Sequence, residues 1–257
     1  MAEPLVLKSK LLTERGVRHG FSTRIGGVSE GPFATLNVAV GPGDEPAAVQ
    51  ENLRRFATAL GVAPERLYQT SQVHGAEVRV IEPRDERLSV LQEHADGLVA
   101  WDPSTAIGIR VADCVPVLLH EGAKNQVAAL HAGWRGVVSG IVQNGVSHLA
   151  RSALSSSSIV AAIGPSIGPC CFEVGEEVAS ALLDAVPDES IVLRGRGPKP
   201  YVDLRLAVRL QLRALGVADA AIEDVPGCTK CDAERFFSHR RDGARSGRLL
   251  AAIAPRA

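Results

Sequence analysis

The stretch "IRVADCVPVLLHEG", residues 109–122, contains a clear core-strand signal with a cysteine at its start. The apolar run after Cys114 is typical of a strand buried in a sheet, where cysteine often packs as a small hydrophobe. Cys114 stands between Asp113 and this run. The residues by themselves leave three interpretations of Cys114 open: a packing residue, a nucleophile or a metal ligand.

Short β-rich runs surround this stretch on both sides. They cover residues 17–23, 76–82, 95–101, 106–112, 115–121, 126–132, 158–164, 221–225 and 248–254. The strands form a block over 76–131 and then alternate with helical segments, which favours one mixed sheet covered by helices over a strict βαβ array. The predicted class is α+β, in a single domain over residues 1–257, because no convincing boundary interrupts the chain.

Capping residues mark the ends of two predicted helices. Asp44 followed by Pro46 predicts a helix start, and Gly61 predicts its end. Asp203 predicts a second helix start, and Gly216 its end. Two more helices are expected over about 135–151 and about 174–186, and the serine-rich stretch 152–158 is expected to be a connector.

The composition limits the function. Lys and Arg number 28 against 29 Asp and Glu, so no global field favours nucleic acid or an anionic membrane. The first ten residues lack the apolar core of a signal peptide, and no run approaches the roughly 18 apolar residues of a membrane span. Five sparse cysteines argue for reduced thiols rather than a disulfide framework. We therefore expect a cytoplasmic, enzyme-sized globular protein.

Two histidines lie where sheet proteins often place their sites. His74 lies in a polar loop between two predicted strands, and His131 ends a strand just before a glycine-flanked turn. Together with Cys114 they match the three protein ligands of a catalytic zinc site, which leaves a fourth position open. Their spacing is unlike that of a zinc finger, so only the fold can bring them together. A metal-free Cys–His pair and structural packing remain the alternatives.

Two segments are candidate anion sites. "GWRG", residues 133–136, puts glycines and Arg135 at a helix start, where backbone N–H groups and the helix dipole favour phosphate or carboxylate. "FFSHRRDGARSGR", residues 236–248, concentrates His239, Arg240, Arg241 and Arg245 in a loop before the final strand. The structural alternatives are a surface charge beside a packed Trp134 and a solvated basic loop.

The other four cysteines form two pairs along the chain. "CTKC", residues 228–231, has the spacing of redox and zinc motifs, but neither a second CxxC nor a His pair completes a structural zinc site. Cys170 and Cys171 are adjacent, and adjacent residues in extended chain point opposite ways, so we expect at most one to face a given pocket. The pattern favours buried or site-flanking thiols.

Together these segments resemble the laccase-domain family of YfiH-type proteins, described as polyphenol oxidases, purine nucleoside phosphorylases and, in some bacteria, peptidoglycan editing factors. The motifs that carry the resemblance are "HGFSTRIGGVSEGPFATLNVA", "TSQVHGAEV", "ADGLVA", "ADCVPVLL", "ALHAGWRG", "AIGPSIGPCCFEVG" and "CTKCDAERFFSHRRDGARSGR". The resemblance implies an α/β sandwich with mixed sheets and one zinc ion bound by His74, Cys114 and His131. It also implies phosphorolysis of adenosine, inosine and guanosine, cleavage of methylthioadenosine, and adenosine deamination.

This expected chemistry assigns roles to further residues. Arg240 and Arg135 would hold the phosphate that attacks C1′ of the ribose. For deamination, zinc would activate a water to attack C6 of adenine. Asp113 is a candidate acid or base, although strand alternation would point it away from Cys114 unless a bulge intervenes. Polar residues in the family-matching loops are candidates for substrate contacts: Arg24, Asn37 and Gln72.

Three alternatives to this function differ in their metal chemistry. A multicopper oxidase needs a blue-copper site and a copper cluster with about eight further histidines, whereas the chain has seven in all. A metal-free cysteine hydrolase or amidase would use Cys114 as nucleophile and His131 as base, on a peptidoglycan precursor. A non-catalytic binding protein would hold zinc without turnover. The sequence leaves the preferred nucleoside and the oligomeric state open.

Overall fold

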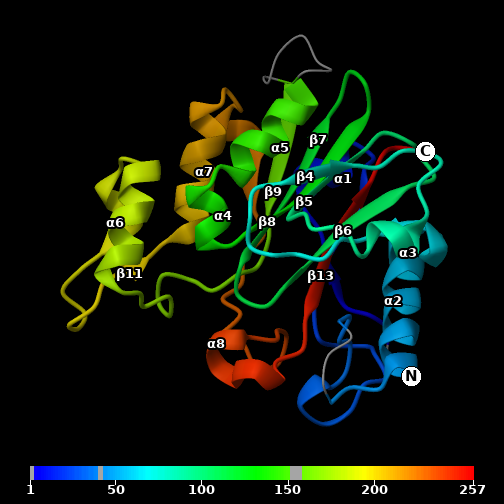
Figure 1. Ribbon diagram of the computed structural model, residues 1–257, viewed down its shortest axis with the longest axis horizontal. Helices are drawn as coiled ribbons and strands as arrows, with labels where there is room; N and C mark the ends of the chain where they lie inside the picture. The colour runs from blue at the N-terminus through cyan, green and yellow to red at the C-terminus, as the bar shows by residue number, and fades with distance from the viewer. Residues whose placement is uncertain (1–2, 40–42, 151–157) are drawn as a thin grey trace.

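The protein is a single-domain α+β structure in which two mixed sheets lie face to face and helices cover both outer faces (Figure 1). The computed structural model describes residues 3–39, 43–150 and 158–257. The predicted α+β class and the sandwich with mixed sheets that the resemblance implies are confirmed, whereas the expectation of one sheet, drawn from the order of the β-rich runs, was wrong. The strands divide into a sheet of five and a sheet of six, with a separate two-stranded ribbon.

The first sheet has the strand order β1-β2-β13-β6-β3. Its strands are β1 (Val6–Leu7), β2 (Arg18–Ser22), β13 (Leu249–Ala254), β6 (Ala106–Val111) and β3 (Leu67–Tyr68). Only the β3–β6 pair is parallel. The C-terminal strand therefore lies in the middle of this sheet, between strands from the first half of the chain.

The second sheet has the strand order β12-β9-β7-β8-β5-β4. Its strands are β12 (Ile222–Asp224), β9 (Ile159–Ile163), β7 (Val115–Glu121), β8 (Gln126–Ala132), β5 (Gly97–Ala100) and β4 (Val78–Val80). The two edge pairs, β12–β9 and β4–β5, are parallel, and the central pairs are antiparallel. The small ribbon pairs β10 (Val192–Leu193) with β11 (Tyr201–Val202).

Most of the helices lie on opposite sides of the sheets, and the last one lies apart from them in the C-terminal loop (Figure 1). They are α1 (Lys10–Glu14), α2 (Pro46–Leu60), α3 (Arg87–Val90), α4 (Trp134–Val138), α5 (Ile141–Ala150), α6 (Glu176–Ala185), α7 (Leu204–Ala214) and α8 (His239–Asp242). Helices α4 to α7 pack on the six-stranded sheet, while α2 packs on the five-stranded sheet. No helix among the described residues is long and apolar enough to cross a membrane.

Strand β7 reads as a nearly continuous apolar run because both of its faces are covered. Val117 and Leu119 point into the core beneath helices α4 to α7. Leu118, between them in sequence, points into the core between the two sheets, where it meets Ile107 and Ile109 of β6. A strand buried on both faces has no solvent side that would favour polar residues, so the usual alternation disappears.

Two of the predicted helices differ from expectation. The N-cap of α2 is Glu45 rather than Asp44, and its side chain makes no capping hydrogen bond. Asp44 instead accepts hydrogen bonds from Ser29 and Asn37, which tie a neighbouring loop to the helix start. The single helix expected over 135–151 is two helices, α4 and α5, because the chain breaks at Gly140 with φ of +88°.

The remaining helix predictions fit the structure. Gly61 ends α2 with a left-handed conformation, φ +70°. The carboxylate of Asp203 accepts a hydrogen bond from the Leu206 N–H and so caps α7. The predicted helix over 174–186 contains α6. Residue 151 and nearly all of the predicted serine connector, 152–158, lie outside the described residues.

Candidate metal centre and cavity

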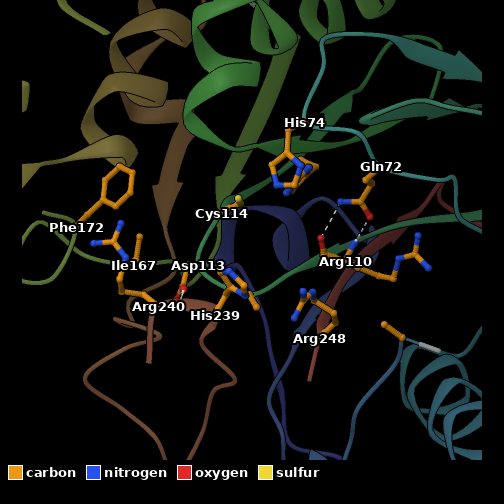
Figure 2. Close-up of a pocket in the computed structure, with 13 residues that line it drawn as sticks. Gln72, His74, Arg110, Asp113, Cys114, Ile167, Phe172, His239, Arg240 and Arg248 are labelled. Atoms are coloured by element: carbon orange, nitrogen blue, oxygen red, sulfur yellow. Dashed lines mark hydrogen bonds between the residues drawn. The ribbon is translucent and has the colours of Figure 1, made fainter. Parts of the chain in front are cut away.

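The fold brings His74, Cys114 and His131 together at one end of the central strands β7 and β8 of the six-stranded sheet. Figure 2 shows His74 and Cys114 at this end. His74 lies in the loop between β3 and β4, Cys114 in the turn from β6 to β7, and His131 on β8. The ligand atoms of the three side chains all lie within 4.8 Å of one another. A thiolate and two imidazoles form one of the ligand sets that hold catalytic zinc.

The buried carboxylate of Asp96 organises two of these ligands. It accepts backbone hydrogen bonds from Val73, His74 and Gly75, at 3.0, 2.9 and 2.7 Å. It also accepts one from His131 Nδ1 at 2.7 Å, which leaves Nε2 of that ring available to a metal. The three backbone bonds hold His74 in a left-handed conformation, φ +61°, that non-glycine residues rarely adopt. Asp96 is thus the partner that positions both imidazoles.

The electrostatics of the centre favour a deprotonated thiol. Burial raises the pKa of Cys114, but the neighbouring His131 and His74 rings outweigh it and bring the pKa to about 6. Burial lowers the pKa of His131, but Cys114 and Asp96 raise it to about 9. Each group thus favours the charged form of the other, the Cys114 thiolate and the His131 imidazolium, and a cation bound at Nε2 of His131 would displace the proton there.

Gly133 leaves the space that the centre needs. A Cβ at this position would come 3.0 Å from Cys114 Sγ and 3.2 Å from His74 Cδ2. Gly133 is the N-cap of α4 and has φ of −70°, so the constraint on the side chain is steric rather than conformational. The donor set, the oriented His131 ring and this open space all fit a bound zinc ion.

The three ligands line one side of a cavity of about 510 Å³. Figure 2 shows its lining residues, with His74 across the cavity from His239 and Arg248. Its lining residues come from both sheets and from the C-terminal loop: Ala39, Gln72, His74, Arg110, Ala112, Asp113, Cys114, His131, Ile167, Phe172, His239, Arg240 and Arg248. This volume is typical of a small-molecule site, and the Phe172 ring offers an apolar surface beside the polar ones.

Three arginines give the cavity a positive charge. Arg110, Arg240 and Arg248 line it, and in the described part of the chain no carboxylate forms an ion pair with any of them. Burial and the charge of Arg248 lower the pKa of Arg110, and burial lowers the pKa of Arg248. Arg110 and Arg248 are half-buried, whereas Arg240 is exposed. Guanidinium groups that line a cavity without an anionic partner are suited to binding an anionic ligand.

Asp113 faces the same cavity as Cys114, contrary to the alternation expected of a strand. Strand β6 ends at Val111, and Asp113 lies in the following turn with φ of +91°, so the strand rule does not apply. Its carboxylate accepts hydrogen bonds from the Thr229 hydroxyl and from the backbone N–H of Arg240, each 2.6 Å. Asp113 thereby joins the C-terminal loop to the metal centre.

Gln72 lines the cavity but uses its amide group structurally. The side chain donates to the Arg110 carbonyl and accepts from the Arg110 N–H, both at 2.8 Å (Figure 2). This pair of hydrogen bonds attaches the loop that carries His74 to strand β6. Of the predicted catalytic and substrate residues, the structure therefore gathers Gln72, Asp113 and Arg240 around the metal ligands.

The other two predicted substrate contacts lie away from this cavity. Arg24 donates from Nε to the Ala34 carbonyl and lines a separate hollow. Asn37 is buried, and its amide donates to the Ala39 carbonyl and to the Asp44 carboxylate. Both side chains stabilise loops through these bonds and do not line the cavity of the metal centre.

The predicted phosphate contact Arg135 is also outside the cavity lining. It is exposed on α4, and its guanidinium group lies 4.5 Å from the centre of the Trp134 ring. This placement matches the structural alternative, a surface charge beside a packed aromatic residue.

Sequence reasoning missed Asp96, Arg110 and Arg248 as site residues. Each interrupts or borders an apolar strand segment, in "ADGLVA", "IGIRVA" and "RLLAAIA". A charged residue inside a core strand is costly unless it is paired or functional, and this signal could have identified them.

Comparison with known proteins places the chain in a family. A family model described as "Multi-copper polyphenol oxidoreductase laccase" matches residues 18–256. The purine nucleoside phosphorylase YlmD of Geobacillus stearothermophilus is 39% identical over 250 residues, covering 94% of this chain and 91% of the relative. The purine nucleoside phosphorylase YfiH of Escherichia coli is 37% identical, covering 93% of this chain and 94% of the relative.

Solved structures agree with this placement. The crystal structure of YlmD from Geobacillus stearothermophilus superposes with a TM-score of 0.91 at 36% identity, covering 100% of this chain and 97% of that one. The Bacillus licheniformis protein YfiH superposes with a TM-score of 0.90 at 28% identity, covering 99% and 97%. The fold and site define an α/β sandwich protein with a His₂Cys centre beneath a cavity. The chain belongs to the laccase-domain family of the YfiH type.

Asp96→Asn tests how the centre is positioned. The substitution keeps the side chain's size but leaves one acceptor oxygen for four donors, so we expect zinc to bind about tenfold to a hundredfold more weakly. Competition with a chromophoric chelator measures the affinity. Asp219→Asn, at an exposed carboxylate paired with Arg209, is the matched control and should bind zinc as the wild type does. Equal affinity in both variants would contradict the role of Asp96.

Proposed function

We propose that this protein is a zinc-dependent purine nucleoside phosphorylase that also deaminates adenosine. The proposed substrates are adenosine, inosine, guanosine and methylthioadenosine, with phosphate as the second substrate, and the proposed setting is the cytoplasm. The observation that carries the proposal is the arrangement around one cavity of about 510 Å³ of a His₂Cys ligand set and three arginines that form no ion pair with any described carboxylate. The names of the relatives at 37% and 39% identity support the same activity.

In phosphorolysis, a phosphate oxygen forms a bond to C1′ of the ribose while the bond from C1′ to the purine nitrogen breaks. The products are the free base and the pentose 1-phosphate. Arg240, Arg248 and Arg110 would bind the phosphate dianion and hold its attacking oxygen near C1′. The Phe172 ring at the cavity wall would pack against the nucleoside.

The metal site and Asp113 would act on the purine base, which is the leaving group. Zinc bound by His74, Cys114 and His131 would supply Lewis acidity at the floor of the cavity. Asp113 lies next to Cys114 in the cavity lining and would hold or deliver a proton there. Its hydrogen bonds from Thr229 and Arg240 keep the carboxylate in place and link its position to the phosphate-binding loop.

A metal-free cysteine hydrolase acting on a peptidoglycan precursor is the second candidate function. It is favoured by one observation: Cys114, His131 and Asp96 have the contacts of a nucleophile, a base and an orienting carboxylate. The low pKa of Cys114, about 6, suits either a nucleophile or a metal ligand. Metal dependence and thiol reactivity separate the two functions.

A nucleoside panel tests the proposed function. We expect adenosine, inosine, guanosine and methylthioadenosine to yield free base only when phosphate is present, and adenosine to yield inosine without it. Chromatography resolves the products, and protein stripped of zinc with a chelator, then reloaded, is the control. A zinc-loaded protein that consumes none of the four nucleosides would be a binding protein or a different enzyme.

Arg240→Ala separates the two reactions. The variant keeps the backbone N–H that binds Asp113 and removes the side chain beyond Cβ, including the guanidinium group that donates to the Glu173 carbonyl. Loss of a charged phosphate contact should lower kcat/KM for phosphate about tenfold to a hundredfold. Deamination, which uses no phosphate, should change little. Arg135→Ala, at an exposed arginine outside the cavity, should leave both rates unchanged. An equal loss of both reactions in the Arg240 variant would assign Arg240 to nucleoside positioning instead.

Alkylation of Cys114 distinguishes a ligand from a nucleophile. A zinc-bound thiolate should react slowly in the untreated protein and faster after chelation, whereas an accessible nucleophile should react at once. Because four other cysteines are present, the measurement must follow the peptide that contains "ADCVPVLL" by mass spectrometry. Rapid alkylation of zinc-loaded protein, or a covalent adduct on Cys114 during turnover, would support the cysteine hydrolase.

A further inference from the structure

The four cysteines outside the metal centre form a second cluster. Cys170 Sγ lies 3.6 Å from the sulfurs of both Cys228 and Cys231, and Cys171 Sγ lies 3.3 Å from that of Cys231. All four sulfurs lie within 4.8 Å of one another. The expectation that only one of Cys170 and Cys171 can face a given site was wrong, because residues 169–171 form a turn rather than extended chain.

The spacing of the sulfurs matches that of a tetrahedral metal site. Four sulfurs at about 2.3 Å from a zinc ion lie roughly 3.8 Å from each other. The contacts of 3.3 to 3.6 Å are close to this value and far above the roughly 2.05 Å of a disulfide bond. The cluster therefore has the form of a ligand shell around a small cation rather than that of two disulfides.

The backbone around the cluster provides hydrogen bonds to one of its sulfurs, that of Cys228. The N–H groups of Gly168 and Cys231 both donate to the sulfur of Cys228. A Cβ on Gly168 would lie 3.2 Å from Cys170 Sγ, so a glycine here leaves room for the sulfurs. The hydrogen bond from the Thr229 N–H to the Ser166 carbonyl, 3.0 Å, holds the two cysteine-bearing segments side by side.

We infer that Cys170, Cys171, Cys228 and Cys231 bind a second zinc ion, in a closed site of four thiolates. Tetrahedral sulfur ligation is typical of zinc or an iron–sulfur centre, and four protein ligands leave no open position for catalysis. The inferred site is thus structural and distinct from the His₂Cys centre, which has three protein ligands. This inference does not depend on the proposed nucleoside chemistry.

The position of the cluster shows what such an ion stabilises. Cys171 directly precedes Phe172, and Thr229 of the CxxC turn donates to Asp113. Both Phe172 and Asp113 line the cavity. The guanidinium group of Arg240 also donates to the Glu173 carbonyl, just after this turn. A cross-link between the two segments therefore holds one wall of the cavity at a fixed distance from the metal centre.

Zinc stoichiometry tests the inference directly. We expect two zinc ions per chain in the wild type, one in Cys114→Ala and one in Cys231→Ser. In the Cys114→Ala, Cys231→Ser double variant we expect none. Lys230→Ala, within the same turn but without a ligand atom, is the matched control and should keep two. Elemental analysis of zinc-loaded, desalted protein gives the counts. Absence of zinc from folded Cys114→Ala protein would overturn the inference while leaving the proposed function untouched.

Peptide-resolved alkylation provides a second measurement that needs no substitution in the cluster. In the zinc-loaded Cys114→Ala variant, the four thiols should be protected and should become reactive when a chelator is added without reductant. If the four thiols became reactive toward the alkylating reagent only after a reductant was added, the cysteines would form disulfides, and the inference would be overturned. Thiols that react before any chelator is added would overturn it as well. Iron with inorganic sulfide in the purified protein would equally overturn the assignment to zinc.

Discussion

The buried carboxylate of Asp96 is the interaction on which the metal centre depends. A buried negative charge is costly without partners, and four donors from the loop 73–75 and from His131 satisfy it. Those bonds hold His74 in an unfavourable backbone conformation and select the ring nitrogen of His131 that faces the site. Burial raises the pKa of Asp96, but the hydrogen bonds from His131 and the backbone lower it below its usual range, so the carboxylate remains charged.

The turn between β6 and β7 is equally important for the geometry of the site, because it connects the two sheets. Strand β6 pairs with β13 and β3 in the five-stranded sheet. Strand β7, in the centre of the six-stranded sheet, begins at Val115, directly after Cys114. Asp113 in this turn has a left-handed conformation, and both Asp113 and Cys114 line the cavity. One reversal of the chain therefore supplies a metal ligand and a carboxylate to the same site.

Charge is distributed locally rather than over the whole molecule. The chain is nearly neutral, with a formal charge of −1, yet three arginines without carboxylate partners among the described residues surround one cavity. Their guanidinium groups are held by backbone carbonyls, as in the bond from Arg110 to the Thr70 carbonyl at 2.7 Å. Carbonyl partners fix the direction of a guanidinium group without neutralising it, so the positive charge remains available to an anion.

The sequence by itself determined the α+β class, most strand positions, the helix ends at Gly61 and Asp203, and, through its family motifs, the three candidate ligands. These features depend on residues that are close in the chain, such as caps and apolar runs. Only the tertiary structure decided how the strands divide between two sheets, that Asp113 faces the cavity, that Arg24, Asn37 and Arg135 do not, and that four cysteines meet. Each of these depends on contacts between segments far apart in sequence, or on the φ angle of a single turn residue, and neither produces a periodic pattern that can be read along the chain.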